Sequence, residues 1–270
     1  MIVTFIGVYL SGLVVILMLM TTVWLISLVV KDSSIVDIVW GLGFVVVALA
    51  YFALTNGWGV RRLIILILVT VWGLRLTLYL GWRNIGKGED PRYQRWREKH
   101  GEDWWWISFF KVFLLQGVAM WIISAPLLAA QFHGGPRTLT LFDLVGVFVW
   151  MVGLLFETVG DWQLARFKAN PANKGKILDR GLWRYTRHPN YFGDSLVWWG
   201  LYLVAVAAPW GLLTIFAPVL MTYLLMRVTG AALLERDMKK RPAYAAYIRR
   251  TSAFIPMPPK PERPQPPQRR

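Results

Sequence analysis

Residues 181–194 read Gly-Leu-Trp-Arg-Tyr-Thr-Arg-His-Pro-Asn-Tyr-Phe-Gly-Asp and lie between a basic loop and a long apolar run. The His188-Pro189 step predicts a helix break, because the residue before proline is pushed toward extended geometry. We expect a membrane helix to open over 191–194. Backbone N–H groups and cations at a helix start form a site for an anion. The alternative is a loop that only sets topology, but topology needs Lys and Arg and not the interleaved Tyr, His, Asn and Asp.

Apolar runs dominate the rest of the chain. The 270 residues are 56% hydrophobic and include 16 Trp. Several runs exceed the ~20 residues that cross a bilayer as a helix. The N-terminus is apolar from the start and has no charged n-region, so we expect a retained first helix. The sequence therefore predicts an all-α, polytopic integral membrane protein with seven transmembrane helices and cytoplasmic cofactor-binding loops.

Short polar segments separate the expected helices. We expect the seven spans over 2–30, 35–54, 60–82, 107–132, 141–165, 191–207 and 212–238. A short amphipathic helix over 242–250 follows, and the Pro-rich basic tail 257–270 is expected to be disordered. These elements predict one seven-helix domain over 1–256, of which 143–256 is the part that contains the quoted stretch.

The net charge of +15 is concentrated outside the apolar runs. Lys and Arg number six in the loop 83–105, seven in the loop 166–187 and eleven from residue 227 onward. The positive-inside rule then places the C-terminus and both loops in the cytoplasm, as in a multi-pass protein of a bacterial inner membrane or its equivalent. This distribution makes nucleic acid a poor partner and favours lipid headgroups and an anionic cofactor. We expect a monomer surrounded by membrane lipids.

Cysteine and histidine usage narrows the possible chemistry. The chain has no cysteine, which excludes disulfides, thiol catalysis and Cys-zinc sites. Its three histidines, His100, His133 and His188, are far apart in the sequence. We therefore expect no metal site.

Polar side chains inside the predicted spans are candidates for function, because ionisable groups in a bilayer are costly and usually functional. Trp72, Arg75, Tyr79 and Arg83 are spaced three, four and four apart. That spacing places them on one face of a helix. Arg83 can extend to the interface. Arg75 lies two turns deeper and needs an anion.

Several acidic residues also lie in or near the spans. Asp37 either complements the dipole at its helix start or stays protonated in a dry pocket and donates a hydrogen bond. Glu157 and Asp161 lie one turn apart and need donors, such as the ribose hydroxyls or the amide of a nucleotide. Arg227 and Glu235 lie two turns apart and either close the same site or form an internal ion pair.

Residues 182–194 and the ending 244–256, which contains Ser-Ala-Phe-Ile-Pro, resemble the C-terminal domain of steroid 5-alpha-reductases, especially a bacterial branch of integral membrane proteins. The resemblance is strong over 143–256 and weaker before it. A shorter Arg-His-Pro-x-Tyr-x-Gly pattern also occurs in isoprenylcysteine carboxyl methyltransferases. That core alone therefore does not choose between cofactors.

The resemblance implies seven transmembrane helices, NADPH in a cytoplasm-facing cavity, and reduction of a carbon–carbon double bond conjugated to a ketone. The substrate is implied to be a steroid or steroid-like lipid that enters from the bilayer. By position, Asp194 stands where the family has Glu, and Lys168 where it has Arg. The cofactor-binding set that we expect is Arg75, Tyr79, Arg83, Glu157, Asp161, Lys168, Asn173, Lys174, Arg184, Tyr185, Arg187, His188, Asn190, Tyr191, Asp194, Arg227 and Glu235.

The substrate end of the chain departs from the family. Steroid enzymes place a Gln-Glu pair and a Tyr around the substrate ketone, whereas this chain has Val36-Asp37 and Trp72. Trp donates one N–H but is not an acid. We assign the stabilisation of the developing oxyanion to protonated Asp37, assisted by the Trp72 N–H, with Tyr79 as the next catalytic candidate.

Two alternatives remain beside an NADPH-dependent reductase. The first is a membrane methyltransferase that uses S-adenosylmethionine, a nearly charge-balanced cofactor with less use for the many cations. The second is a non-catalytic lipid-binding membrane protein, which explains the Trp-rich surface but not Arg75 and Asp37. No Gly-x-Gly-x-x-Gly follows a predicted strand, so a dinucleotide would be held without a Rossmann fold.

Overall fold

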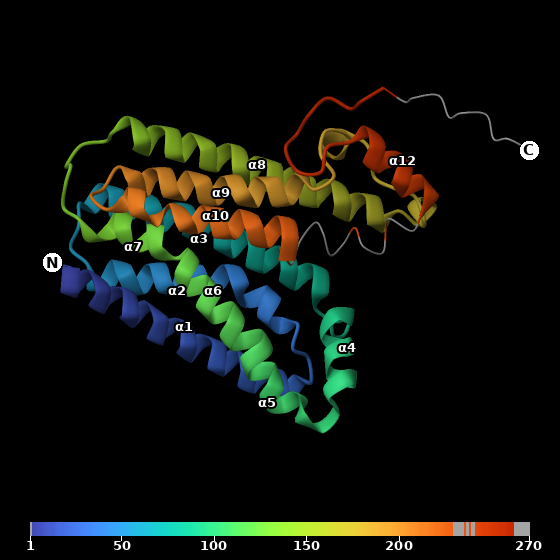
Figure 1. Cartoon of the computed structure of the whole chain (residues 1–270), viewed down its shortest axis with the longest axis horizontal. Helices are drawn as coiled ribbons and strands as arrows, with labels where there is room; N and C mark the ends of the chain where they lie inside the picture. The colour runs from blue at the N-terminus through green and yellow to red at the C-terminus, as the bar shows by residue number, and fades with distance from the viewer. Residues whose placement is uncertain (1, 229–234, 236–237, 239–240, 262–270) are drawn as a thin grey trace, which may run out of the picture. The chain divides into compact units, whose positions relative to one another are not determined.

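The fold is described from a computed structural model of the chain (Figure 1). The structure describes residues 2–228, 235, 238 and 241–261. These residues form helices and turns without a named strand, and an isolated bridge pairs Thr186 with Ser252. The predicted all-α class is therefore confirmed for the described part of the chain.

The long helices are α1 (Ile2–Val30), α2 (Ile35–Leu54), α3 (Gly59–Asn84), α8 (Leu141–Ala169) and α9 (Pro189–Val206). Between α3 and α8 lie α4 (Pro91–His100), η1 (Gly101–Asp103), α5 (Trp104–Ser108), the π-helical η2 (Phe109–Leu114), α6 (Leu115–Ile123) and α7 (Ala125–Phe132). The short 3-10 turns η3 (Pro171–Asn173) and η4 (Gly181–Arg184) precede α9. After α9 come η5 (Gly211–Ile215), α10 (Phe216–Tyr223), the π-helical η6 (Leu224–Val228) and α12 (Pro242–Arg250).

Six helical segments of the described chain are long and apolar enough to cross a membrane, as in an integral multi-pass membrane protein. They are Thr4–Val30, Ile35–Leu54, Gly59–Asn84, Pro91–Phe132, Leu141–Ala169 and Gly211–Val228. The predicted number of seven is therefore not reproduced. The span expected over 191–207 corresponds to α9, whose first turns carry the polar residues Asn190, Asp194 and Ser195. The segment expected over 212–238 is described only as far as Val228 and at residues 235 and 238.

The chain divides into two compact units, and the single domain over 1–256 stays a prediction. The first unit comprises 1–147 and 200–218, and the second comprises 148–199 and 219–270. The quoted stretch 181–194 lies entirely in the second unit. The residues predicted at the substrate end, Asp37 and Trp72, belong to the first.

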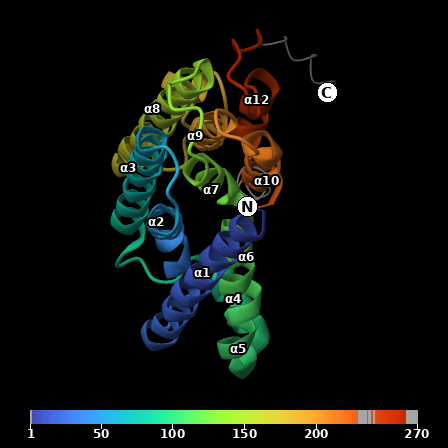
Figure 2. The same ribbon diagram turned by 90° about the vertical axis from the view of Figure 1, so that its left-hand side faces the viewer.

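In the first unit, α2 packs against both α1 and α3 (Figures 1 and 2). Phe44 and Tyr51 on α2 are fully buried. A Cβ added to Gly73 would lie 2.6 Å from the carbonyl oxygen of Gly41, so the backbones of α2 and α3 touch at these glycines. Small residues permit such close approach between membrane helices, where van der Waals packing drives association.

A buried ion pair joins the starts of α3 and α8 in the same unit. The Nε of Arg61 donates to Oδ1 of Asp143 at 2.8 Å, and Nη2 donates to Oδ2 at 2.9 Å. The other donors of this guanidinium reach the carbonyl oxygens of Pro136 and Thr138. The sequence pattern did not predict this pair, because its two residues are 82 positions apart in the chain.

The loop expected over 83–105 contains the helix α4. Pro91 occupies its first turn, and the side chain of Asp90 accepts a hydrogen bond from the backbone N–H of Arg92. Both are strong helix-start signals. Glu89, just before α4, accepts from Arg97 Nε at 2.8 Å and from the backbone N–H of Ser33 at 2.7 Å. Partial burial opposes the ionisation of Glu89, but these bonds outweigh it and lower its pKa.

In the second unit, α8 and α9 approach through glycines. A Cβ on Gly153 would lie 2.6 Å from the backbone nitrogen of Val197 and 2.7 Å from the carbonyl oxygen of Gly193. The C-terminal segment is tied to this unit, because the N–H of Met257 donates to the carbonyl oxygen of Tyr185 at 3.0 Å. The tail expected to be disordered over 257–270 is thus hydrogen-bonded at its start. Its remaining residues, 262–270, lie outside the described residues.

Candidate functional site

The quoted stretch folds as η4, a short bridge segment and the start of α9. Helix α9 begins at Pro189, so the chain breaks at the predicted His188-Pro189 step. The indole N–H of Trp183 donates to the carbonyl oxygen of Gly160 at 3.1 Å, which anchors η4 to α8. The hydroxyl of Thr186 donates to the carbonyl oxygen of Phe254 at 2.7 Å and anchors the stretch to the C-terminal segment.

Arg187 and His188, both predicted to bind a cofactor, are buried against Glu235, which was predicted to do the same. Nε of Arg187 donates to Oε1 of Glu235 at 2.6 Å, and Nη1 donates to the carbonyl oxygen of Thr251 at 2.6 Å. Nε2 of His188 lies 3.1 Å from the same Glu235 oxygen. The structure brings these three residues together, but it engages them with one another and with the backbone.

The ionisation of Glu235 follows from these contacts. Burial opposes its charged form, but hydrogen bonds from His188 and Arg187, with the charge of Arg187, outweigh burial and lower its pKa to about 2. Burial and the nearby carboxylate raise the pKa of Tyr244. Arg187, His188 and Glu235 therefore form a charged clamp that fixes the stretch to the C-terminal segment.

Asp161 on α8 and Asn190 on α9 form a second contact of predicted site residues. Nδ2 of Asn190 donates to Oδ1 of Asp161 at 3.1 Å. Oδ1 of Asn190 is buried and has no hydrogen-bond partner among the residues that the structure describes. Because a buried polar atom without a partner is costly, this acceptor is suited to a ligand donor. Glu157 and Asp194, also predicted, are buried on the same two helices.

The other predicted residues of the second unit lie nearer the surface. The ring of Tyr191 stacks on His188, with centroids 5.6 Å apart. Tyr185 is exposed. The exposed cations among the predicted cofactor residues of this unit are Lys168, Lys174, Arg184 and Arg227.

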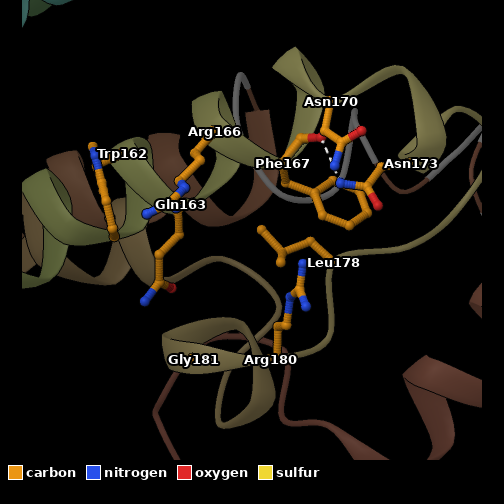
Figure 3. A pocket seen from close by; sticks show the side chains of 9 residues that line it. All are labelled: Trp162, Gln163, Arg166, Phe167, Asn170, Asn173, Leu178, Arg180 and Gly181. Carbon is orange, nitrogen blue, oxygen red and sulfur yellow. Dashed lines mark hydrogen bonds between the residues drawn. The ribbon is translucent and has the colours of Figure 1, made fainter.

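A pocket of about 550 Å³ opens at the polar end of α8 (Figure 3). Helix α8 and the residues just after it supply one wall, and the chain leading into η4 supplies the other. Two guanidinium groups and three side-chain amides line it, namely Arg166, Arg180, Gln163, Asn170 and Asn173. Of these, only Asn173 was in the predicted site. The apolar lining comes from Trp162, Phe167 and Leu178.

This pocket lies on a different face of α8 from the predicted cofactor residues. Asp161 and Lys168 are seven residues apart and therefore share a face. Trp162 and Arg166 lie one and five positions after Asp161. At 3.6 residues per turn, both therefore point more than a quarter turn away from the face that carries Asp161. The sequence did indicate a basic loop here, but the spacing of its amides gave no sign of a pocket.

In the first unit, the predicted face of α3 forms as expected. The Cζ of Arg75 lies 5.5 Å from the centroid of the Tyr79 ring, and that of Arg83 lies 5.6 Å from the same centroid. Trp72 is fully buried, and its ring centroid lies 5.7 Å from that of Phe44 on α2. Tyr79 is thus held between two guanidinium groups one turn away on either side.

Asp37 lies in a polar cluster of the first unit that the sequence did not predict. Its Oδ2 accepts from Nη2 of Arg92 at 2.7 Å, and its Oδ1 accepts from the hydroxyl of Tyr93 at 2.8 Å. Nε2 of Gln116 donates to that hydroxyl at 3.2 Å. Both oxygens of Asp37 are acceptors here, so a donor role would require protonation and loss of one partner. The signal that could have found Arg92 and Tyr93 is the Asp-Pro start of α4.

Metal-ligating side chains do not gather in groups of three or more anywhere in the described residues. The geometry therefore offers three places for chemistry, each within one unit. They are the Asp161–Asn190 contact with its unsatisfied acceptor, the pocket beside α8, and the cluster around Asp37.

Comparison with known proteins gives two relatives. The chain is 27% identical over 280 residues, covering 92% of this chain and 79% of the relative, to the uncharacterized protein C594.04c of Schizosaccharomyces pombe. It is 31% identical over 93 residues to the probable O-methyltransferase ustE of Ustilaginoidea virens, a match that covers 34% of this chain and 33% of that protein. No solved structure matches. The family described as "Protein of unknown function (DUF1295)" matches residues 23–251, and the chain belongs to this family.

Proposed function

We propose that this protein is a membrane-embedded, NADPH-dependent reductase of the carbon–carbon double bond in an α,β-unsaturated ketone of a steroid-like lipid. The observation that carries the proposal is the buried Oδ1 of Asn190, which has no hydrogen-bond partner among the described residues. Its amide nitrogen already donates to Asp161. The pair therefore has acceptor capacity for a neutral donor, such as the carboxamide or a ribose hydroxyl of a nicotinamide nucleotide.

The residues around this pair fit such a group. Asp161 is 3% exposed, and its carboxylate can accept a ribose hydroxyl in a water-poor setting. Lys168 shares the Asp161 face of α8 and supplies a positive charge toward phosphate. Arg187 has a different role in the proposal, because its donors are engaged by Glu235 and Thr251. Asn190 and Asp161 thus orient the nucleotide, whereas Arg187 fixes the backbone that presents Asn190.

When bound, NADPH supplies the hydride, and the protein supplies orientation and electrostatics. Negative charge develops on the substrate carbonyl oxygen, and a preorganised donor there stabilises the transition state. In the first unit we keep Asp37 and the N–H of Trp72 for that task, with Tyr79 as the next candidate. Tyr93 and Arg92 position Asp37 by donating to its two oxygens, so a protonated Asp37 donates to the substrate only after one of these hydrogen bonds is released.

The partial match to a probable O-methyltransferase favours a second candidate, a methyltransferase that uses S-adenosylmethionine. An acceptor like Oδ1 of Asn190 would also suit the amino groups of that cofactor. The two candidates differ in the charge of the cofactor. NADPH carries several phosphate charges, and S-adenosylmethionine has no phosphate.

A thermal-shift comparison in detergent tests both candidates. Parent protein is melted with NADPH, NADH and S-adenosylmethionine, and a ligand at ~100 times its dissociation constant adds ~2.7 kcal/mol of stability. We expect a shift with NADPH that Asn190→Ala weakens about ten- to a hundredfold in affinity. A shift with S-adenosylmethionine alone would replace the reductase by the methyltransferase.

A further inference from the structure

The pocket beside α8 has features that the proposed nucleotide site does not use. Arg166 and Arg180 bring two guanidinium groups to its walls. Within the described part of the chain, neither guanidinium has a carboxylate partner. The Cζ of Arg166 lies 5.4 Å from the centroid of the Trp162 ring. The one acid next in sequence, Asp179, is engaged by Nη2 of Arg250. Among the described residues of the unit, no carboxylate therefore neutralises the positive charge at the pocket.

Two of the three amides at the pocket have an NH₂ group without a hydrogen-bond partner among the described residues, whereas that of Asn173 donates to the carbonyl oxygen of Phe167 at 2.9 Å. Oε1 of Gln163 accepts from the backbone N–H of Leu182 at 3.0 Å. Oδ1 of Asn170 accepts from the backbone N–H of Ala172 at 3.0 Å. Because the acceptor oxygen of each amide is occupied, its NH₂ group remains as a donor. Two cations and two amide donors suit an oxyanion with several acceptor oxygens, such as a phosphate.

The position of the pocket indicates where the phosphate comes from. Helix α8 is one of the candidate membrane spans, and the pocket lies along its last two turns. Trp162 at the pocket is 56% exposed, and exposed tryptophans near the polar ends of membrane helices lie at headgroup level. Basic pockets at this level recognise anionic lipid headgroups.

We propose that the pocket formed by the end of α8 and the chain leading into η4 binds the phosphodiester headgroup of an anionic phospholipid. The guanidinium groups of Arg166 and Arg180 hold the phosphate. The free NH₂ groups of Gln163 and Asn170 bind headgroup oxygens. The cavity of about 550 Å³ is in the range of small-molecule sites and exceeds what a bare phosphate fills. This site is separate from the Asp161–Asn190 contact.

The test uses full-length protein in neutral detergent with phosphatidylglycerol, phosphatidylcholine, sn-glycerol 1-phosphate and inorganic phosphate as probes. Native mass spectrometry measures bound lipid at increasing lipid concentration. The double variant Arg166→Gln/Arg180→Gln removes both guanidinium groups. Arg249→Gln, an exposed arginine of α12 in the same unit, is the control for a general loss of charge.

We expect phosphatidylglycerol to bind in preference to phosphatidylcholine, and each guanidinium lost to weaken it about fivefold, or about 25-fold together. Arg249→Gln should retain the parental affinity. Lipid binding by the double variant equal to that of the parent, or an equal loss in Arg249→Gln, would overturn the proposal. Inorganic phosphate or glycerol phosphate binding as tightly as the lipid would assign the pocket to a free phosphate.

Measurements of NADPH binding distinguish the proposed lipid site from the proposed nucleotide site. The double variant should keep the parental NADPH shift, and Asn190→Ala should keep the parental lipid affinity. If the double variant instead loses discrimination between NADPH and NADH while retaining lipid, the pocket reads the nucleotide 2′-phosphate and the lipid assignment is wrong. If the parent binds no NADPH, the reductase proposal fails, whereas the lipid measurement still decides the pocket.

Discussion

Nε of Arg187 lies 2.6 Å from Oε1 of Glu235, and both side chains are buried. The pair joins the stretch before α9 to a residue 48 positions later in the chain. Arg187 also donates to the carbonyl oxygen of Thr251, so one guanidinium holds two distant parts of the second unit. These contacts fix the backbone that leads to Asn190, and cofactor binding by Arg187 and Glu235 stays a prediction.

Glu235→Gln should destabilise the second unit near neutral pH. The pKa of Glu235 falls from 4.5 to about 2 on folding, which corresponds to about 3 kcal/mol of stability. Because the folded-state pKa is the lower one, this contribution is fully present above about pH 4.5. It is lost as the pH falls toward 2. Denaturant unfolding in detergent at several pH values measures it.

The control for this prediction is Glu98→Gln, which changes the same charge at an exposed position of α4. Its unfolding free energy should match that of the parent at every pH. The gap between the parent and Glu235→Gln should be constant from pH 7 to pH 5 and shrink below that. A gap that grows on acidification would show that Glu235 is not ionised in the folded protein.

Gly193→Ala should disrupt the packing of α8 on α9. A Cβ there would meet the backbone nitrogen of Glu157 and lie 2.5 Å from the carbonyl oxygen of Gly153. Backbone atoms cannot move aside as a flexible side chain can, so the two helices must separate. We expect a loss of about 1–3 kcal/mol or more, measured by thermal unfolding in detergent.

Gly7→Ala in α1 is the matched change, because no atom lies within 4 Å of a Cβ added there. Alanine is favoured over glycine in a helix by about 1 kcal/mol, so this variant should be neutral or slightly stabilised. Equal melting temperatures for Gly193→Ala and the parent would mean that α8 and α9 do not pack as closely as described.

Asp143→Asn should strongly destabilise the first unit. Arg61 is fully buried, and the substitution leaves its charge without a counter-ion, which typically costs about 3–5 kcal/mol. Replacing both partners, as Arg61→Met with Asp143→Leu, should restore much of that loss, because no buried charge remains. A double variant as unstable as Asp143→Asn would show that the hydrogen bonds to Pro136 and Thr138 matter more than the charge.

The sequence predicted α2 and α12 with the bounds that the structure shows, because polar or proline residues flank both segments. It also predicted the Arg75, Tyr79 and Arg83 face, since helical spacing alone determines that face. It missed α4, whose charged residues suggested a loop. The Asp90-Pro91 pair indicated a helix start. A helix of ten residues with one buried side chain, however, has only a weak apolar pattern.

The sequence did not predict contacts between residues that are far apart in the chain. Arg61 and Asp143 are 82 residues apart, and no local pattern connects them. The same holds for Asp37 and Tyr93, which come from α2 and α4. Asp161 and Asn190 were both in the predicted site, but the resemblance and not the spacing brought them together. Charge pairing across elements depends on packing, which periodicity does not encode.

The cluster around Asp37 allows the catalytic prediction to be tested with separate variants. Asp37→Ala removes the acceptor of Arg92 and Tyr93, and Asp37→Asn keeps an oxygen for one of them. Tyr93→Phe leaves Asp37 paired with Arg92 alone. For each variant, NADPH affinity, melting temperature and turnover of an enone such as a 3-oxo-4-ene steroid are measured.

If Asp37 polarises the substrate oxygen, Asp37→Ala should lose about 10²–10³ in turnover, the scale of deleting one oxyanion donor, while NADPH binding survives. Asp37→Asn should lose less turnover than Asp37→Ala if polarisation of the substrate oxygen dominates. It should lose about as much as Asp37→Ala if proton transfer dominates. Tyr93→Phe should lose less than about tenfold, since its hydroxyl is committed to Asp37. A loss in Tyr93→Phe as large as that in Asp37→Ala would make the phenol the donor. If Asp37→Ala keeps the parental turnover but melts at a lower temperature, Asp37 only stabilises the packing of α4 on α2. Tyr79 is then the next candidate for the acid.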